Sequence, residues 1–181
     1  MTQGVTLSVR LLDAPDAAAY RSLRLRMLLR YPDAFTSSYE EDVAHPLEWT
    51  QSRIAYSPWT PGNFILGAFD GDGGLIAAIG IKREERRKQV HKATLFGMFV
   101  APEHQGRGIG NALLHACLTR CRQVDGLLQI HLTVTAGNET AFALYCSAGF
   151  VVYGSEPRAV IVDGVGYAKT QMLLALDSAA A

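Results

Sequence analysis

Residues 95–110 read LFGMFV, APEH and QGRGIG, from Leu95 to Gly110. An apolar run of strand type ends at Pro102, three glycines follow within five residues, and an amphipathic segment begins at Asn111. This order predicts a strand, a tight loop and the start of a helix. Such a loop leaves backbone N–H groups uncommitted beside the positive end of the helix dipole, which favours an anion, most commonly a phosphate.

Two familiar phosphate loops do not fit this segment. A dinucleotide fingerprint, G-x-G-x-x-G, places Asn111 or Leu113 at the position of its last glycine, and no Gly-Lys pair of a nucleoside triphosphate loop occurs in the chain. What fits is Q-x-x-G-x-G, carried by Gln105, Gly108 and Gly110. The alternative is a glycine-rich turn that only connects a strand to a helix.

Length and composition favour one domain over residues 1–181 with a sizeable core, because nearly half of the residues are apolar. Seventeen basic residues balance 17 acidic ones, so bulk charge favours neither nucleic acid nor an anionic membrane. The chain has no apolar run of about 18 residues, and its first residues lack a signal-peptide pattern. We therefore expect a soluble, cytoplasmic protein.

The three cysteines form no pattern of metal ligands. Cys117 and Cys121 lie four residues apart in the apolar stripe of the predicted helix, and Cys146 stands apart from them. Buried thiols are the expected interpretation, and we expect no metal.

Helices dominate the N-terminal third after a short strand over residues 7–12. The pattern predicts helices over residues 17–31 and 47–55, with a short one between them that Ser37 or Ser38 caps. We expect Arg21, Arg24 and Arg30 to be solvated. The acidic run Glu40, Glu41 and Asp42 has two interpretations, helix capping or a wall that faces an acceptor.

Strands and helices alternate in the rest of the chain. The strands are predicted over residues 63–69, 75–81, 90–100, 127–134, 150–153 and 165–176, and the helices over 110–124 and 139–148. Asn138 is placed to cap the second of these helices and Gly149 to end it. The strand, helix and strand over residues 90–134 predict a right-handed parallel crossover.

A second motif follows the crossover. Asn138, Ala141, Leu144, Tyr145, Gly149 and Phe150 fit N-x-x-A-x-x-L-Y-x-x-x-G-F. With the glycine loop, this order resembles the GNAT superfamily of acyl-CoA N-acyltransferases. The resemblance implies an α/β (α+β) fold of one GNAT-type domain. Its mixed, mostly antiparallel sheet has a central parallel strand pair splayed around the cofactor, and helices cover both faces.

The same resemblance assigns cofactor-binding residues for acetyl-CoA as co-substrate. Backbone groups of Met98, Phe99 and Val100 would pair with the pantetheine arm. Amides of the loop would hold the pyrophosphate, and Asn138 and Phe142 would line the reactive end. Phe142 has the alternative role of a core aromatic. The loop residues concerned are Gln105, Gly106, Arg107, Gly108, Ile109, Gly110 and Asn111.

The implied reaction is direct transfer of an acetyl group from acetyl-CoA to a primary amine. A backbone N–H near Met98 would stabilise the oxyanion, and Tyr145 would protonate the leaving thiolate. A phenol with a pKa near 10 gives its proton to a thiol of pKa near 8.5 at a cost of about 2 kcal/mol, so neighbouring groups must help. The alternative for Tyr145 is a packed tyrosine with a satisfied hydroxyl.

The base and the acceptor stay open. No carboxylate lies between Leu95 and Val100, so a water chain ending at Glu40, Glu41, Glu84 or His91 is one option. The acceptor could be a small-molecule amine or an amine of a peptide or protein. The resemblance implies that it binds between residues 35–49 and 158–167. A homodimer is compatible with the resemblance. The rival interpretation is a non-catalytic acyl-CoA sensor or interaction module on the same fold.

Overall fold

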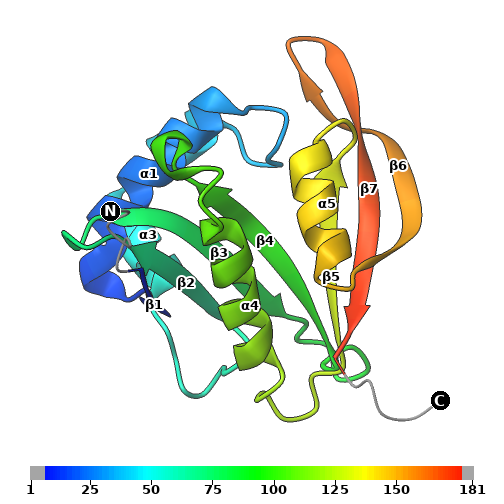
Figure 1. The fold of residues 1–181 in the computed structure, drawn as a ribbon, viewed down its shortest axis with the longest axis horizontal. Helices are drawn as coiled ribbons and strands as arrows, with labels where there is room; N and C mark the ends of the chain where they lie inside the picture. The colour runs from blue at the N-terminus through cyan, green and yellow to red at the C-terminus, as the bar shows by residue number, and fades with distance from the viewer. Residues whose placement is uncertain (1–6, 177–181) are drawn as a thin grey trace, which may run out of the picture.

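One seven-stranded sheet organises the chain, which a computed structural model describes over residues 7–176 (Figure 1). The strand order is β1-β2-β3-β4-β5-β7-β6, and the β4–β5 pair is parallel while the other pairs are antiparallel. The strands are β1 Ser8–Leu11, β2 Phe64–Phe69, β3 Leu75–Arg83, β4 Lys92–Val100, β5 Gln129–Thr135, β6 Val151–Val162 and β7 Val165–Ala175.

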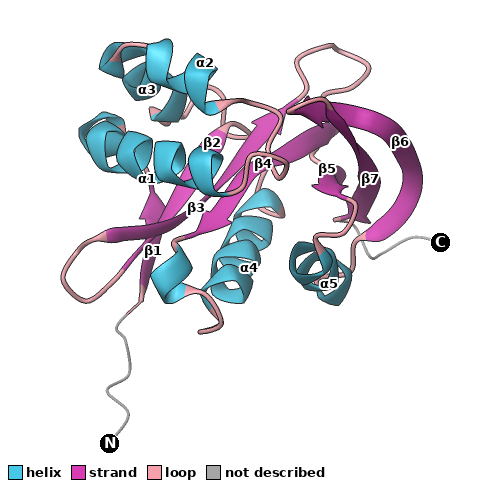
Figure 2. Ribbon diagram, turned by 90° about the horizontal axis from the view of Figure 1, so that it is seen from above, coloured by secondary structure: helices cyan, strands magenta, loops and turns pink. Residues whose placement is uncertain are grey.

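Helices cover both faces of this sheet (Figure 2). The α-helices are α1 Ala17–Arg30, α2 Tyr39–Ala44, α3 Leu47–Ile54, α4 Ile109–Cys121 and α5 Glu139–Ser147, with short 3₁₀ turns at Ala14–Asp16 and Pro102–His104. Figure 2 shows α1, α2 and α3 on one face and α4 and α5 on the other. The mixed sheet with helices on both faces confirms the predicted fold class.

The central parallel pair is short. β4 and β5 are paired only from Lys92 with Gln129 to Thr94 with His131. Beyond Thr94 the two strands diverge, as Figure 1 shows, and β5 continues beside β7. Among residues 7–176, no strand pairs with the second half of β4 on the edge that faces away from β3. Backbone groups on this edge can therefore bond to other partners.

A β-bulge interrupts β4 within this open half. Opposite β3, Gly80 pairs with Phe96 and Ala78 with Phe99, so Gly97 and Met98 together oppose a single residue. Gly97 has a φ of +58°, a conformation that costs residues with a Cβ more than glycine. The bulge turns the strand where it borders both cavities described below.

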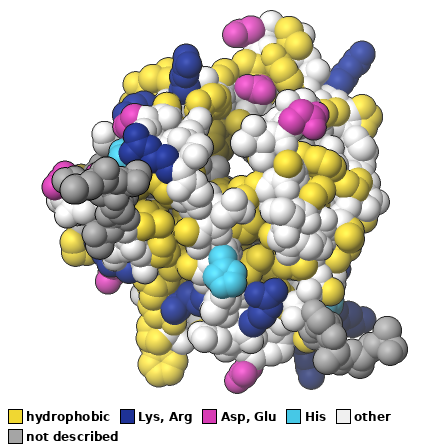
Figure 3. Space-filling view, viewed as in Figure 1, with side chains coloured by type: hydrophobic (Ala, Val, Ile, Leu, Met, Phe, Trp, Pro, Cys, Tyr) yellow, Lys and Arg dark blue, Asp and Glu magenta, His cyan; other side chains and the backbone are white. Residues whose placement is uncertain are grey.

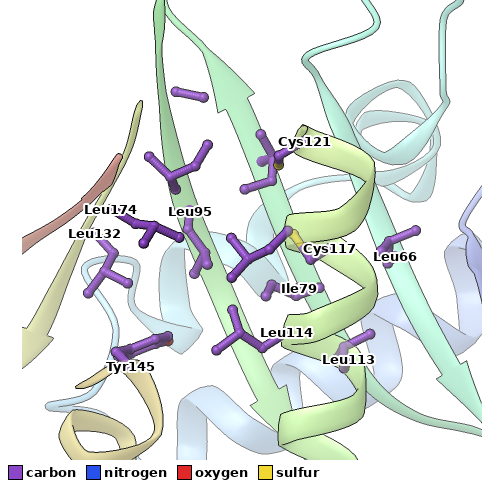
Figure 4. Close-up of a cluster of buried hydrophobic side chains, with 14 of the residues drawn as sticks. Leu66, Ile79, Leu95, Leu113, Leu114, Cys117, Cys121, Leu132, Tyr145 and Leu174 are labelled. Atoms are coloured by element: carbon purple, nitrogen blue, oxygen red, sulfur yellow. The ribbon is translucent and has the colours of Figure 1, made fainter. Parts of the chain in front are cut away.

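The core is divided between the two faces of the sheet. On one face, α4 directs Leu113, Leu114 and Cys117 onto the strands, and Tyr145 approaches from α5 (Figure 4). On the other face, Tyr20 and Met27 of α1 are packed in a second buried cluster. Cys117 and Cys121 are fully buried, which confirms the interpretation as core thiols.

Two expectations from sequence need correction. The strand predicted over residues 150–153 extends to Val162, because its hairpin with β7 continues through register shifts at Gly154 and near Arg158 that break the apolar alternation. Arg24 is buried rather than solvated, because it forms an ion pair with Asp42 of α2. The Ser38 capping box with Glu41 is as predicted. No helix within residues 7–176 has the length and apolarity to cross a membrane.

Candidate active site

The glycine loop joins β4 to α4 and leaves the first turn of α4 open. Gly106 and Gly108 have φ values of +72° and +77°, and a Cβ at either position would meet no atom within 4 Å. Their requirement for glycine therefore comes from the backbone conformation. Gly108 is the N-cap of α4, which has no side-chain cap and no acidic residue in its first turn. The positive helix end is thus free to receive an anion.

Gln105 fixes the loop to its surroundings. Its side-chain amide donates a hydrogen bond of 3.0 Å to the carbonyl oxygen of Val100 and lies 3.4 Å from the hydroxyl of Tyr31 at the end of α1. The first residue of the motif thereby connects the loop, the end of β4 and α1. This contact explains in part why the motif begins with a glutamine.

A cavity of about 840 Å³ lies beside the loop. It is bounded by the loop, the second half of β4 and α5, and Figure 3 shows the surface hollowed between α4 and α5. The predicted residues that line it are Met98, Phe99, Val100, Gln105, Gly106, Gly108, Ile109, Gly110, Asn111, Asn138 and Tyr145.

Two predicted cofactor residues lie outside this lining. Arg107 is exposed on the loop, and Phe142 is partly buried against the core cluster beneath α4 and α5. Phe142 thus occupies the place that its alternative interpretation, a core aromatic, requires. A role for Arg107 in binding stays a prediction.

Asn138 has a structural role at the edge of the cavity. Its side-chain oxygen accepts a hydrogen bond of 3.1 Å from the backbone N–H of Ala141, so it caps α5 as the sequence predicted. The cap fixes the first turn of α5, the helix that carries Tyr145. Contact between Asn138 and a cofactor stays a prediction.

Tyr145 extends from α5 towards the bulge of β4. Its hydroxyl donates to Met98 Sδ at 3.6 Å, and its ring meets Phe150 edge-on with centroids 5.7 Å apart. The side chain is 7% exposed. Burial, with a smaller contribution from the Cys117 thiol, raises the pKa of Tyr145 well above its ordinary value. The phenol is therefore protonated at neutral pH, and sulfur is only a weak acceptor for it.

Sequence reasoning missed a hydrogen-bonded cluster that ties Asp33 and Ala34, which line this cavity, to the sheet. Lys169 of β7 is buried, and its Nζ donates to the Thr135 hydroxyl at 2.8 Å and the Ala34 carbonyl at 3.1 Å. The Thr135 hydroxyl donates in turn to the Asp33 carbonyl at 2.7 Å. These bonds attach the loop after α1 to the sheet, and no local pattern identifies them because their partners are distant in sequence.

The candidates for a general base lie away from the cavity. Glu41 completes the cap of α2, and Glu84 bonds through its backbone N–H to Lys92 at the opposite end of β4 from the loop. None of Glu40, Glu41, Glu84 and His91 lines the cavity, and Asp33 contributes the one carboxylate among its lining residues in the described part of the chain. Within residues 7–176, no three His, Cys, Asp or Glu side chains are grouped to hold a metal ion.

Curated proteins with related sequences are acetyltransferases. The chain is 32% identical over 110 residues to the ribosomal protein bS18 alanine N-acetyltransferase of Escherichia coli, covering 61% of this chain and 69% of that protein. It is 37% identical over 120 residues to the N-alpha-acetyltransferase RimI of Mycobacterium tuberculosis, covering 64% and 70%. A spermidine N(1)-acetyltransferase of Vibrio cholerae is 32% identical over 75 residues, which span 41% of this chain and less than half, 43%, of that relative's length.

Solved structures show the same fold. A GNAT-family acetyltransferase from Streptococcus pneumoniae matches with a TM-score of 0.83 at 24% identity, covering 93% of this chain and 99% of that one. A GCN5-related N-acetyltransferase from Kribbella flavida matches with a TM-score of 0.76 at 25% identity, covering 93% and 97%. The model of the acetyltransferase (GNAT) family matches residues 28–150, more than half of the chain. The chain therefore belongs to the GNAT family of acetyl-CoA-dependent acetyltransferases.

Proposed function

We propose that this chain transfers the acetyl group of acetyl-CoA directly to a primary amine, and that Tyr145 donates a proton to the leaving thiolate. The observation that carries the proposal is the position of the Tyr145 hydroxyl. It lies against Met98 at the β4 bulge, in the cavity that the glycine loop also lines. Tyr145 and the glycine loop, for which we predict anion binding, therefore line the same cavity.

The residues present fit coenzyme A. The uncapped first turn of α4, with Ile109, Gly110 and Asn111, presents backbone N–H groups where the pyrophosphate is expected. Met98 to Val100 lie on the half of β4 that has no strand partner on the side of β5 within residues 7–176. The Val100 carbonyl accepts from Gln105, and the other backbone groups on this side are available to the amides of the pantetheine arm. The cavity of about 840 Å³ is large enough to enclose much of a drug-sized ligand.

Bound acetyl-CoA supplies the acetyl group as a thioester: the amine nitrogen forms a bond to its carbonyl carbon, the carbon–sulfur bond breaks, and a thiolate leaves. The backbone N–H near Met98 is proposed to hold the carbonyl oxygen while it carries negative charge. Tyr145 gives its hydroxyl proton to the sulfur and regains one from solvent. The amine releases its surplus proton to water.

The raised pKa of Tyr145 affects this step in two ways. It keeps the proton on the phenol at every pH where the enzyme would work. It also makes complete transfer to a thiol more costly than the roughly 2 kcal/mol that applies between ordinary pKa values. We therefore expect the phenol to transfer its proton late, once negative charge has developed on the sulfur.

Substitution of Tyr145 by phenylalanine tests the proposal. We expect Tyr145→Phe to lower kcat by about 10²- to 10⁴-fold, the usual contribution of a general acid, with the affinity for acetyl-CoA nearly unchanged. Tyr153→Phe is the matched control, because Tyr153 is exposed and lies outside the lining of the cavity. Thiol release from acetyl-CoA measures turnover, and calorimetric titration measures binding.

Other outcomes of this experiment are equally informative. Unchanged turnover in Tyr145→Phe would remove Tyr145 from the mechanism. Tight binding of acetyl-CoA by the unmodified chain, without acetylation of any amine, would favour the acyl-CoA sensor.

A further inference from the structure

A second cavity, of about 880 Å³, adjoins the one beside the glycine loop. Ala34 and Phe35 line both cavities, and along β4 the lining changes from Gly97 in the second cavity to Met98 in the first. The second cavity is also lined by α3 and by strand residues of β3. It therefore reaches the β4 bulge from the opposite side to the glycine loop, where an acceptor amine would meet the thioester.

The charged residues that line this second cavity are all basic. They are Arg24, Arg53, Lys82 and Lys169, and no aspartate or glutamate is among the lining residues in the described part of the chain. The chain as a whole has equal numbers of acidic and basic residues. The excess of positive charge is therefore a property of this cavity.

Three of these cations, Arg53, Lys82 and Lys169, take part in no ion pair within residues 7–176. Asp42 neutralises Arg24, so Arg24 does not count among the unpaired positive charges of the cavity. Lys169 is 3% exposed, and its Nζ donates only to backbone carbonyls and the Thr135 hydroxyl, which are uncharged. Arg53 is held above the rings of Trp49 and Phe96, with its guanidinium carbon 5.0 and 5.6 Å from their centroids. Within residues 7–176, neither Lys169 nor Arg53 takes part in an ion pair.

We propose that the acceptor carries a carboxylate or a similar oxyanion beside its amine, that Arg53 binds this anionic group in the second cavity, and that the charge of Lys169 attracts it. This inference rests on the proposed acetyl transfer and specifies its acceptor. Arg53 and Lys169 lie on α3 and β7, so an anion between them is attracted from two walls. A polyamine such as spermidine would bring more positive charge to this site and is disfavoured.

The same charge helps the amine to react. An acceptor ammonium must lose a proton before it can attack, and nearby positive charge lowers the pKa of an ammonium group. Burial lowers the pKa of Lys169 itself, and the nearby Asp33 carboxylate acts in the opposite direction. The basic cavity thus favours the neutral amine at neutral pH, which lessens the need for a carboxylate base on β4.

Matched acceptors test the inference on the intact protein. The panel consists of L-amino acids from glycine to phenylalanine, the carboxamide of each, spermidine and an alanyl tripeptide amide, with acetylation measured as thiol release and as product mass. The best free amino acid should exceed its carboxamide by about 10- to 100-fold in kcat/KM, the usual range for hydrogen bonds to a charged group. The carboxamide has the more easily deprotonated amine, so pKa alone predicts the opposite order.

Variants of Arg53 then test whether the second cavity causes the preference for the free amino acid over its carboxamide. Arg53 is exposed, so its replacement should leave folding intact. Arg53→Gln should reduce the preference for the acid, and Arg53→Glu should reverse it in favour of the carboxamide. Arg122→Gln is the control, because it removes one positive charge from the end of α4 outside both cavities. Thermal melting of each variant verifies folding.

Failure of this inference is distinguishable from failure of the proposed function. Acetylation of spermidine, the tripeptide amide or the carboxamides at rates equal to or above those of the acids would overturn the anionic acceptor and leave the acetyltransferase intact. A preference for the acids that Arg53→Glu leaves unchanged would also overturn the anionic acceptor. If acetyl-CoA binds and no member of the panel is acetylated, the inference is wrong for amino acids. If acetyl-CoA does not bind, the proposed function itself fails.

Discussion

At the scale of single residues, Arg24 and Asp42 show how a charge is accommodated inside this fold. Both side chains are buried, and the guanidinium of Arg24 donates through Nε to Asp42 and through Nη2 to the Ser37 hydroxyl. Arg24 lies on α1 and Asp42 on α2, so their pairing places α2 against α1. An unpaired charge at either position would bear the full cost of leaving water.

Removal of one partner should therefore be costly. We expect Asp42→Asn to lower the free energy of unfolding by about 3–5 kcal/mol, because it leaves Arg24 charged and buried without its counterion. Urea denaturation measures the change. Glu40→Gln on the same helix removes an exposed carboxylate and should change stability by less than about 0.5 kcal/mol. Equal effects of the two substitutions would show that the pair does not stabilise the fold.

Tyr145 gives a prediction of pH dependence at the same scale. Its raised pKa means that the protonated phenol, the form that can donate, persists above pH 10. The acceptor amine becomes reactive as it loses its proton with rising pH. We therefore expect kcat/KM to rise between pH 6 and 9.5 and then level off, without a fall due to Tyr145. A descending limb near pH 8 or 9 that Tyr145→Phe abolishes would contradict this.

At the scale of elements, the glycine loop and α4 form the unit that we propose to bind the cofactor. The loop takes left-handed conformations at Gly106 and Gly108 and delivers α4 with an uncapped N-terminus. The sequence predicted this loop and the helix after it, because the geometry of a glycine-rich loop follows from local residues. The full length of β6 was not predicted, since Pro157 and the register shifts of its hairpin break the strand pattern.

Two glycine substitutions separate the effect of backbone strain on stability from the effect of the loop on acetyl-CoA binding. Gly108→Ala should destabilise the protein by about 1–2 kcal/mol, the cost of a left-handed residue with a Cβ, and should also weaken acetyl-CoA binding. Gly73→Ala is matched to it, because Gly73 has a φ of +80° and equally open surroundings in the β2–β3 hairpin. Both variants should lose similar stability in thermal melts, and only Gly108→Ala should lose affinity. Equal affinities would show that the loop does not contact the cofactor.

At the scale of the whole molecule, the divergence of β4 and β5 creates the space in which both cavities meet. The sequence predicted the parallel pair and its place in the sheet from the strand, helix and strand order. It did not predict the contacts of Lys169 with Thr135 and the loop after α1, because these partners come together only in the folded chain. The basic second cavity could not be predicted from the sequence either, because its arginines and lysines come from four different elements.

The central claim is that the cavity beside the glycine loop binds acetyl-CoA, and a thermal shift measurement tests it directly. The unmodified protein is melted with acetyl-CoA, ATP or NAD at matched concentrations. At about 100 times its dissociation constant, acetyl-CoA should stabilise the fold by about 2.7 kcal/mol and raise Tm by about 5–11 °C. ATP and NAD should have little effect. No shift with acetyl-CoA, or a larger shift with either nucleotide, would contradict the assignment of this cavity.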